Sequence, residues 1–104
     1  MVLNVMQWTI RPEKKEAYVE WTQSAIGRTL GAPGVIEFCA YRPVSGDYEV
    51  CVTYQFADLE SWLAWYSNDD VQAVLEELRG LTSSLTRGLM GPSPVVPQAI
   101  RPGG

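Results

Sequence analysis

The apolar and polar positions of residues 35–57 form two runs separated by a segment rich in turn-forming residues. Val, Ile, Phe, Tyr, Thr and Cys dominate both runs, while Pro, Ser, Gly and Asp gather between them. Such a pattern is typical of a β-hairpin with a short loop. A three-residue loop at 44–46 puts Gly46 at the left-handed position that such loops need, so we predict a hairpin closed there.

That loop sets the register of the predicted hairpin, because a shift by one residue would mix apolar and polar side chains on each face. It places Phe38 opposite Val52 and Cys39 opposite Cys51. The first face is then apolar and suits a cover of helices. The second face is mixed, and it carries Glu37, Cys39, Tyr41, Glu49, Cys51 and Thr53. A mixed face of this kind indicates a lined cavity or a partner subunit rather than open water.

The periodicity of the remaining chain predicts four further elements. They are a strand over 2–10, a helix from Pro12 that stops at 31–34, a helical region over 59–80 broken at Asn68, and a strand over 81–90. Pro12 suits a first helical turn, where its missing N–H costs nothing, and Asp58 is a good N-cap for the second helical region. Four prolines in 91–104 exclude a regular element there, so we divide the chain into a domain over 1–90 and a Pro-rich tail.

The order strand–helix–strand–strand–helix–strand predicts an α+β fold of the ferredoxin-like βαββαβ type. In this fold a four-stranded antiparallel sheet carries its helices on one face. Two helices cover only one face of such a sheet, so the other face must find cover elsewhere. A second copy of the chain is the most economical source. We therefore expect a homodimer in which two sheets close over a shared interior.

The composition narrows the classes of partner. The chain has 104 residues, 46% of them hydrophobic, and a net charge of −4. This allows one small core and offers no basic cluster for nucleic acid or an anionic membrane surface. No stretch approaches the roughly 20 apolar residues that cross a bilayer, and the first residues are typical of a strand rather than a signal peptide. We expect a cytoplasmic protein that binds neither nucleic acid nor membrane.

Histidine is absent from the sequence, and there are only two cysteines. The absence of histidine removes the commonest general base and the usual ligand of zinc and haem. We therefore expect no metal site and no haem. Two cysteines in such a chain are more typical of free thiols, while their opposed positions in the predicted hairpin leave a cross-strand disulfide as the alternative.

Three stretches of the chain resemble the antibiotic biosynthesis monooxygenase (ABM) domain of the dimeric α/β-barrel superfamily. They are PEKKEAYVEW, GAPGVIEF and FADLESWLAWYSNDDVQAVLEEL. The resemblance covers about residues 1–90 and implies two sheets paired into a barrel with a small aromatic substrate inside. For members that oxidise quinols or anthrones it implies chemistry without metal, flavin or haem, in which the substrate's own enolate reduces oxygen.

The haem-degrading branch of that family uses an asparagine on the first strand, a tryptophan in the second helix and a histidine further along it. Asn4 and Trp65 stand at the first two positions, but the histidine position falls near Glu76. The resemblance therefore argues against haem binding of this type.

The resemblance and the sorting of the two faces give a set of candidate site residues. Asn4 and Trp65 would position substrate and oxygen, since an amide can donate to an oxyanion. Glu37 and Tyr41 would manage protons, because burial can raise the pKa of a carboxyl group into a useful range. The residues expected to bind substrate are Met6, Trp8, Cys39, Cys51 and Thr53.

Each candidate has a structural alternative. Asn4 can bond to backbone at a strand edge, Glu37 can pair with an arginine or sit at the barrel rim, and Tyr41 can simply pack. Trp65 points to a pocket wall or an interface, because it lies about 110° from the helical stripe that would face the core. That stripe consists of Leu59, Trp62, Leu63 and Tyr66.

The leading hypothesis is a cofactor-independent monooxygenase-like protein that acts on a small phenolic, quinol or polyketide-type aromatic substrate. A polyketide cyclase or isomerase of the same superfamily, and a non-catalytic homodimer that binds a small hydrophobic ligand, are the alternatives. An open apolar pocket between the sheet and the second helical region, with Asn4 and Trp65 on its wall, would favour the enzymes. A lumen filled with side chains would favour the structural dimer.

Overall fold

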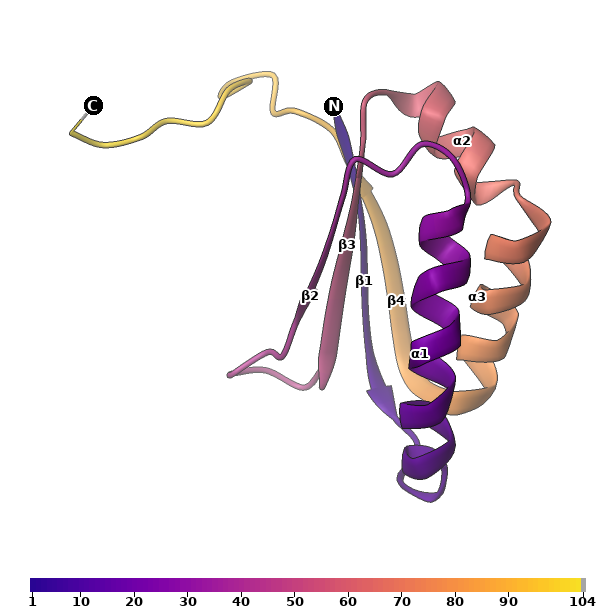
Figure 1. Ribbon diagram of the computed structural model, residues 1–104. Helices are drawn as coiled ribbons and strands as arrows, with labels where there is room; N and C mark the ends of the chain where they lie inside the picture. Colours follow the sequence, from indigo (N-terminus) through magenta and orange to yellow (C-terminus); the bar gives the residue numbers. More distant parts are fainter. Residues whose placement is uncertain (104) are drawn as a thin grey trace.

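The computed structural model describes residues 1–103 and confirms the predicted order of elements (Figure 1). The elements are β1 (Val2–Ile10), a 3₁₀ turn η1 (Pro12–Lys14), α1 (Lys15–Gly31), β2 (Glu37–Tyr41), β3 (Val50–Phe56), α2 (Leu59–Tyr66), α3 (Asp69–Leu81) and β4 (Thr82–Met90). Residues 91–103 form no helix or strand and run in an extended path away from the domain (Figure 1). No helix among residues 1–103 is long and apolar enough to span a bilayer.

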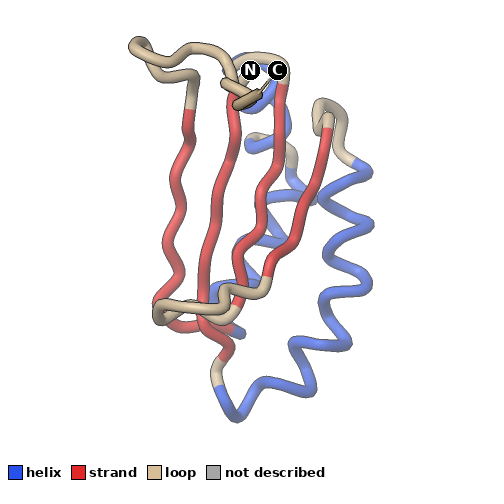
Figure 2. Tube along the Cα trace, turned by 90° about the vertical axis from the view of Figure 1, so that its left-hand side faces the viewer, coloured by secondary structure: helices blue, strands red, loops and turns tan. Residues whose placement is uncertain are grey.

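The four strands form one antiparallel sheet in the order β2-β3-β1-β4, which confirms the predicted α+β, ferredoxin-like fold. All three helices pack on one side of the sheet (Figure 1), and the other side, called here the open face, is bare of helices (Figure 2). Strand alternation assigns to the open face Leu3, Val5, Gln7, Thr9, Glu37, Cys39, Tyr41, Cys51, Thr53 and Gln55. The core lies on the helix side, where Val2, Asn4, Met6 and Trp8 of β1 are buried.

The predicted hairpin register is wrong by two residues. Cys39 lies opposite Thr53, not Cys51, and Phe38 lies opposite Tyr54. A shift of two keeps every side chain on its predicted face, because side chains alternate with a period of two. In the observed register Tyr41 lies opposite Cys51, and Glu49 precedes β3 and bonds to β1. Its backbone N–H donates to Trp8 O at 3.0 Å, and its Oε1 accepts the N–H of Ile10 at 2.8 Å.

The turn of the hairpin is therefore longer than the predicted three-residue loop and covers residues 42–49. Gly46 within it has φ +88, the left-handed conformation expected for it. Because Cys39 and Cys51 are not opposed, the register no longer favours a bridge between them, and both are free thiols.

Helix starts follow the capping residues that the sequence supplies. The Asp58 carboxylate accepts the backbone N–H of Ser61 at 2.8 Å and caps α2. The Asn68 side chain accepts the N–H of Asp70 at 2.9 Å and caps α3, so the break predicted there is confirmed. Pro12 opens a 3₁₀ turn rather than the helix itself, and α1 begins at Lys15.

The face that α2 turns to the core differs from the prediction. Leu59 and Leu63 are 59% and 55% exposed, whereas Trp65 is 1% exposed. The reason lies at the end of α1, where the Thr29 carbonyl has no intrahelical donor because Pro33, four residues on, lacks an N–H. Trp65 Nε1 donates to that carbonyl at 2.9 Å, and this contact turns the indole inward.

Candidate functional site

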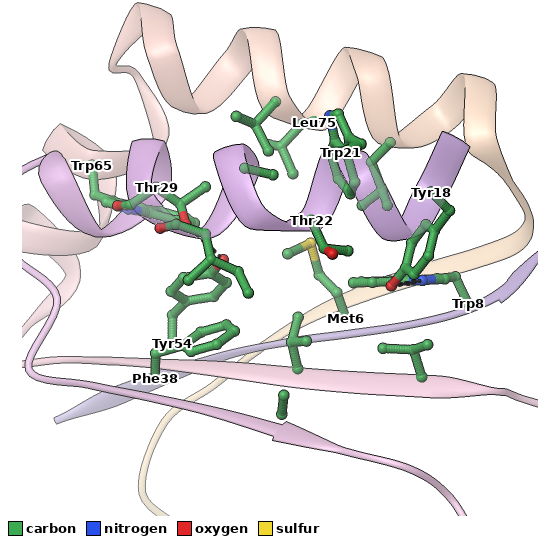
Figure 3. A pocket seen from close by; sticks show the side chains of 17 residues that line it. Met6, Trp8, Tyr18, Trp21, Thr22, Thr29, Phe38, Tyr54, Trp65 and Leu75 are labelled. Atoms are coloured by element: carbon green, nitrogen blue, oxygen red, sulfur yellow. Dashed lines mark hydrogen bonds between the residues drawn. The ribbon is translucent and has the colours of Figure 1, made fainter. Parts of the chain in front are cut away.

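A cavity of about 180 Å³ lies between the sheet and helices α1 and α3. Its wall is mostly aromatic and aliphatic, with Met6 of β1 near the middle, Trp21 and Leu75 on the helix side, and Phe38 on the sheet side (Figure 3). The cavity is on the helix side of the sheet, within one copy of the chain. Such a site can hold a small apolar ring away from water.

One end of the cavity is formed by Trp8 and Tyr18 (Figure 3). Trp8 Nε1 donates to Tyr18 Oη at 3.2 Å, and both side chains are buried. Burial raises the pKa of Tyr18, an effect that the indole hydrogen bond only partly offsets. The phenol is therefore neutral at physiological pH and can act as a hydrogen-bond donor.

The opposite end of the cavity is formed by Thr29, Tyr54 and Trp65 (Figure 3). The hydroxyl groups of Thr29 and Tyr54 are 3.0 Å apart, and the Tyr54 and Trp65 ring centroids are 4.7 Å apart. Burial raises the pKa of Tyr54 as well, while its bond to Thr29 acts in the opposite direction. This end of the cavity thus contains two hydrogen-bonded hydroxyl groups beside aromatic rings.

A β-bulge beside Trp8 shapes the first end. The β1–β4 register shifts between Gln7 and Thr9, so that Ser84 and Leu85 together lie opposite Trp8. Ser84 has φ +53, a left-handed conformation that is uncommon for a residue other than glycine. Bulges of this kind bend a strand and redirect a side chain. Here the bulge accompanies the inward position of the Trp8 indole.

Helix α1 is held over the cavity by a cluster centred on Glu77 of α3. Arg28 donates to both Glu77 carboxylate oxygens, at 2.8 and 3.0 Å, and Trp21 Nε1 donates to Oε1 at 2.8 Å. These donors, the Arg28 guanidinium first, lower the pKa of Glu77. Because Trp21 also lines the cavity, the cluster fixes part of its wall.

A groove adjoins the cavity on the same side of the sheet and is lined by Asn4, Trp62, Tyr66, Arg87, Gly88 and Leu89. Asn4 is 6% exposed, and its Oδ1 accepts from Trp62 Nε1 at 3.2 Å. Its amide N–H₂ has no acceptor among residues 1–103. The Arg87 guanidinium lies over the Tyr66 ring, 5.7 Å from the centroid, and donates to its hydroxyl. The groove thus offers an amide and a guanidinium as donors to an oxygen atom.

The family model for antibiotic biosynthesis monooxygenase matches residues 1–77, about three quarters of the chain. The chain belongs to this family. A comparison with curated proteins finds no match. The resemblance carried by the sequence motifs is thereby confirmed.

Solved structures with the same fold include SnoaB, a cofactor-independent oxygenase from Streptomyces nogalater, in a mutant form. It has a TM-score of 0.73 and 15% identity, and the match covers 93% of this chain and 97% of that one. A dimeric ferredoxin-like protein of unknown function from Thermobifida fusca has a TM-score of 0.72 and 13% identity, covering 86% and 88%. A DABB family protein with a ferredoxin-like fold from Mesorhizobium loti has a TM-score of 0.78 and 17% identity, covering 88% and 96%. At these identities the likeness to this ABM chain shows the fold alone.

The residues predicted for the site are divided between the two sides of the sheet. Met6, Trp8 and Trp65 line the cavity of this ABM domain, and Asn4 lies in the adjoining groove, bonded to Trp62. The others lie on the open face, away from the cavity: Glu37, Tyr41, Cys39, Cys51 and Thr53. Among residues 1–103 no group of three or more His, Cys, Asp or Glu could hold a metal ion.

Several polar residues of the cavity and groove were not predicted. Tyr18 and Thr29 stand on the buried side of α1 together with Ala25, so in the sequence they are indistinguishable from packing residues. Tyr54 stands on the apolar face of the hairpin in the same way. The sequence does not indicate that Arg87 belongs to the groove, because it is one of several exposed residues in the edge strand β4.

Proposed function

We propose that this ABM protein is a cofactor-independent monooxygenase that acts on a small phenolic, quinol or polyketide-type aromatic substrate. The observation that carries the proposal is the cavity of about 180 Å³ with aromatic walls and polar ends, within one copy of the chain. A ring held there is oriented and kept from water, which is what oxidation by the substrate's own electrons requires of a protein. The description of SnoaB as a cofactor-independent oxygenase supports the same reading.

We assign different roles to the residues of the cavity and to those of the adjoining groove, the two compartments of the site. Trp65 orients the ring from the end wall of the cavity, and Asn4 offers its amide N–H₂ from the groove to a substrate oxygen or to reduced oxygen. The two compartments adjoin because Asn4 is the register partner of Tyr54, which lines the cavity. The hydroxyl group of Tyr18 stays protonated, so it stabilises a substrate oxyanion as a donor rather than acting as a base.

Proton removal from the substrate is the step that the cavity itself supports least. None of the 17 side chains on its wall is a carboxylate, amine or imidazole. The substrate must therefore have an acidic hydroxyl group of its own, or enter as its anion. This observation also favours a second candidate function, the binding of a small aromatic ligand without turnover, and it counts against a cyclase, which needs a base.

Oxygen uptake decides between turnover and binding alone. We expect the protein to consume oxygen with members of a panel of quinols and phenols. Asn4→Ala should lower the rate about 100-fold, because it removes a donor aimed at developing negative charge, and Trp65→Phe should lower it through loss of ring orientation. Glu37→Gln and Tyr41→Phe, on the open face, are the matched variants.

Because the open-face pair does not reach the cavity, we expect both variants to keep most of the rate. A loss confined to them would move the chemistry to the open face, between two copies of the chain. No uptake with any substrate, by a protein that still binds aromatic rings, would leave binding without turnover as the function.

We further propose that the protein is a homodimer joined through the open face. Leu3 and Val5 lie there half-buried on a central strand with no helix over them (Figure 2), and the Thermobifida fusca protein of the same fold is described as dimeric. Sedimentation at micromolar concentration should give a two-chain particle. Val5→Glu should dissociate it, whereas Val19→Glu, on the exposed side of α1, should not. A single-chain particle for the unaltered protein would exclude the dimer.

A further inference from the structure

Almost every polar hydrogen on the wall of the cavity has a hydrogen-bond acceptor within the protein. Seven lining side chains have one: Trp8, Tyr18, Trp21, Thr22, Thr29, Tyr54 and Trp65. Each of the three indole N–H groups already donates a hydrogen bond. The acceptors are Tyr18 Oη for Trp8 (3.2 Å), Glu77 Oε1 for Trp21 (2.8 Å) and Thr29 O for Trp65 (2.9 Å). No indole N–H remains for a ligand.

The hydroxyl groups of three further residues are also engaged. Thr22 donates to the carbonyl of Val19 at 2.7 Å, and Thr29 donates to the carbonyl of Ile26 at 3.1 Å. A hydroxyl group has one proton. Either hydroxyl can donate in the 3.0 Å contact between Thr29 and Tyr54, and with the Thr29 proton on the Ile26 carbonyl we assign Tyr54 as the donor. The proton of Tyr54 is thereby used.

Tyr18 alone keeps an unused proton. Its oxygen accepts from Trp8, and its O–H has no acceptor among residues 1–103. Burial holds the group in its protonated form. Figure 3 shows the hydroxyl group beside the Trp8 indole at one end of the cavity. The Tyr18 oxygen is satisfied as an acceptor, and a ligand oxygen in the cavity could take up its remaining proton.

The size of the cavity limits the ligand that can bring that oxygen. An apolar cavity of about 150 Å³ is known to hold benzene, and the cavity here measures about 180 Å³. One ring with a small substituent fits this space, whereas three fused rings exceed it.

We propose that the cavity binds a single-ring aromatic ligand whose acceptor oxygen, a ketone, quinone or phenolate oxygen, takes the hydrogen bond of Tyr18 Oη–H. Trp8 positions the phenol by donating to it, which leaves the Tyr18 proton directed to the ligand. The inference rests on the proposed function, since it concerns the same cavity. It narrows the substrate class from phenolic and polyketide-type aromatics to those of one ring.

Two probes of nearly equal shape test the Tyr18 contact. Acetophenone has a carbonyl oxygen where α-methylstyrene has a CH₂ group. We expect Tyr18→Phe to weaken acetophenone binding about 3- to 10-fold, the range for one neutral hydrogen bond, and to leave α-methylstyrene binding unchanged. Quenching of tryptophan fluorescence measures both dissociation constants. Tyr54→Phe is the matched variant and should keep the acetophenone affinity, because the Tyr54 proton is already engaged.

A second measurement does not depend on any variant. The carbonyl stretch of bound acetophenone should lie at lower frequency than in an alkane solvent, because its oxygen accepts a hydrogen bond. An unshifted stretch, or an equal loss in Tyr18→Phe and Tyr54→Phe, would overturn the assignment to Tyr18. Anthrone, a three-ring ketone, should not bind, and binding as tight as that of acetophenone would overturn the single-ring limit.

These outcomes are separate from those of the proposed function. A protein that binds acetophenone through Tyr18 but consumes no oxygen with any phenol or quinol would support this inference and overturn the monooxygenase. If Tyr18→Phe changed neither oxygen consumption nor acetophenone binding, the result would support the monooxygenase and overturn the assignment to Tyr18.

Discussion

Replacement of Trp65 by alanine should lower the free energy of unfolding by about 3–5 kcal/mol, the range for removal of a fully buried tryptophan. Trp65 is 1% exposed, and its ring centroid lies 4.7 Å from that of Tyr54 and 5.1 Å from that of Phe56. The change also removes the donor to the Thr29 carbonyl, for which Pro33 offers no replacement. Thermal unfolding followed by circular dichroism should show a midpoint lower by roughly 15–30 °C.

Trp62 provides the matched control, because it stands on the same helix but is only partly buried. Trp62→Ala removes a stacked contact with Tyr66 and a hydrogen bond to Asn4, and we expect it to cost less than half as much as Trp65→Ala. Equal losses would mean that the two indoles contribute alike and that the α1–α2 contact has no special weight.

Local signals in the sequence were enough for the element order and for the starts of α2 and α3. Asp58 and Asn68 cap helices because their side-chain oxygens reach N–H groups two or three residues on, and no distant contact is needed. The sorting of the hairpin faces is local in the same sense, since strand alternation fixes it. These features follow from residues that are close together in the chain.

The features that the sequence did not reveal depend on contacts between distant residues. The end of the hairpin is tied to β1 by Glu49 bonding to Ile10, and Trp65 is held inward by its bond to a carbonyl of α1. The helical stripe with Leu59 and Leu63 is more apolar than the side of α2 that carries Trp65. Hydrophobic periodicity does not show that the Trp65 indole has a hydrogen-bond acceptor on α1. The sequence left two places open for the cavity: an interior between two sheets, suggested by the bare sheet face, and a pocket between the sheet and the second helical region.

The candidate site shows the same division. Met6 and Trp8 were assigned to a binding wall from their shared strand face, and they line the cavity. Tyr18 was not predicted, because a tyrosine on an apolar stripe is indistinguishable from a packing residue until its hydrogen bonds are known. Only the pairing with Trp8, and the engagement of every other polar hydrogen on the wall, sets it apart.

Substitution of Gly34 by alanine should lower the free energy of unfolding by about 2–3 kcal/mol. Gly34 has φ +115, a conformation that other residues rarely adopt, and an added Cβ would lie 3.2 Å from the carbonyl oxygen of Ser61. That oxygen belongs to the backbone of α2, so it cannot turn aside as a flexible side chain would. The midpoint of thermal unfolding should fall by roughly 10–20 °C.

Gly46→Ala separates the two causes of that loss. Gly46 has φ +88, but an added Cβ would meet nothing within 4 Å, so only the conformational cost, about 1 kcal/mol, applies. The excess loss in Gly34→Ala then measures how closely the α1–β2 loop approaches α2. That loop lies between Thr29 of α1 and Phe38 of β2, which both line the cavity. Gly34→Ala should therefore also weaken ligand binding, whereas Gly46→Ala should not. Equal effects of the two substitutions would show that the approach to Ser61 places no constraint on the fold.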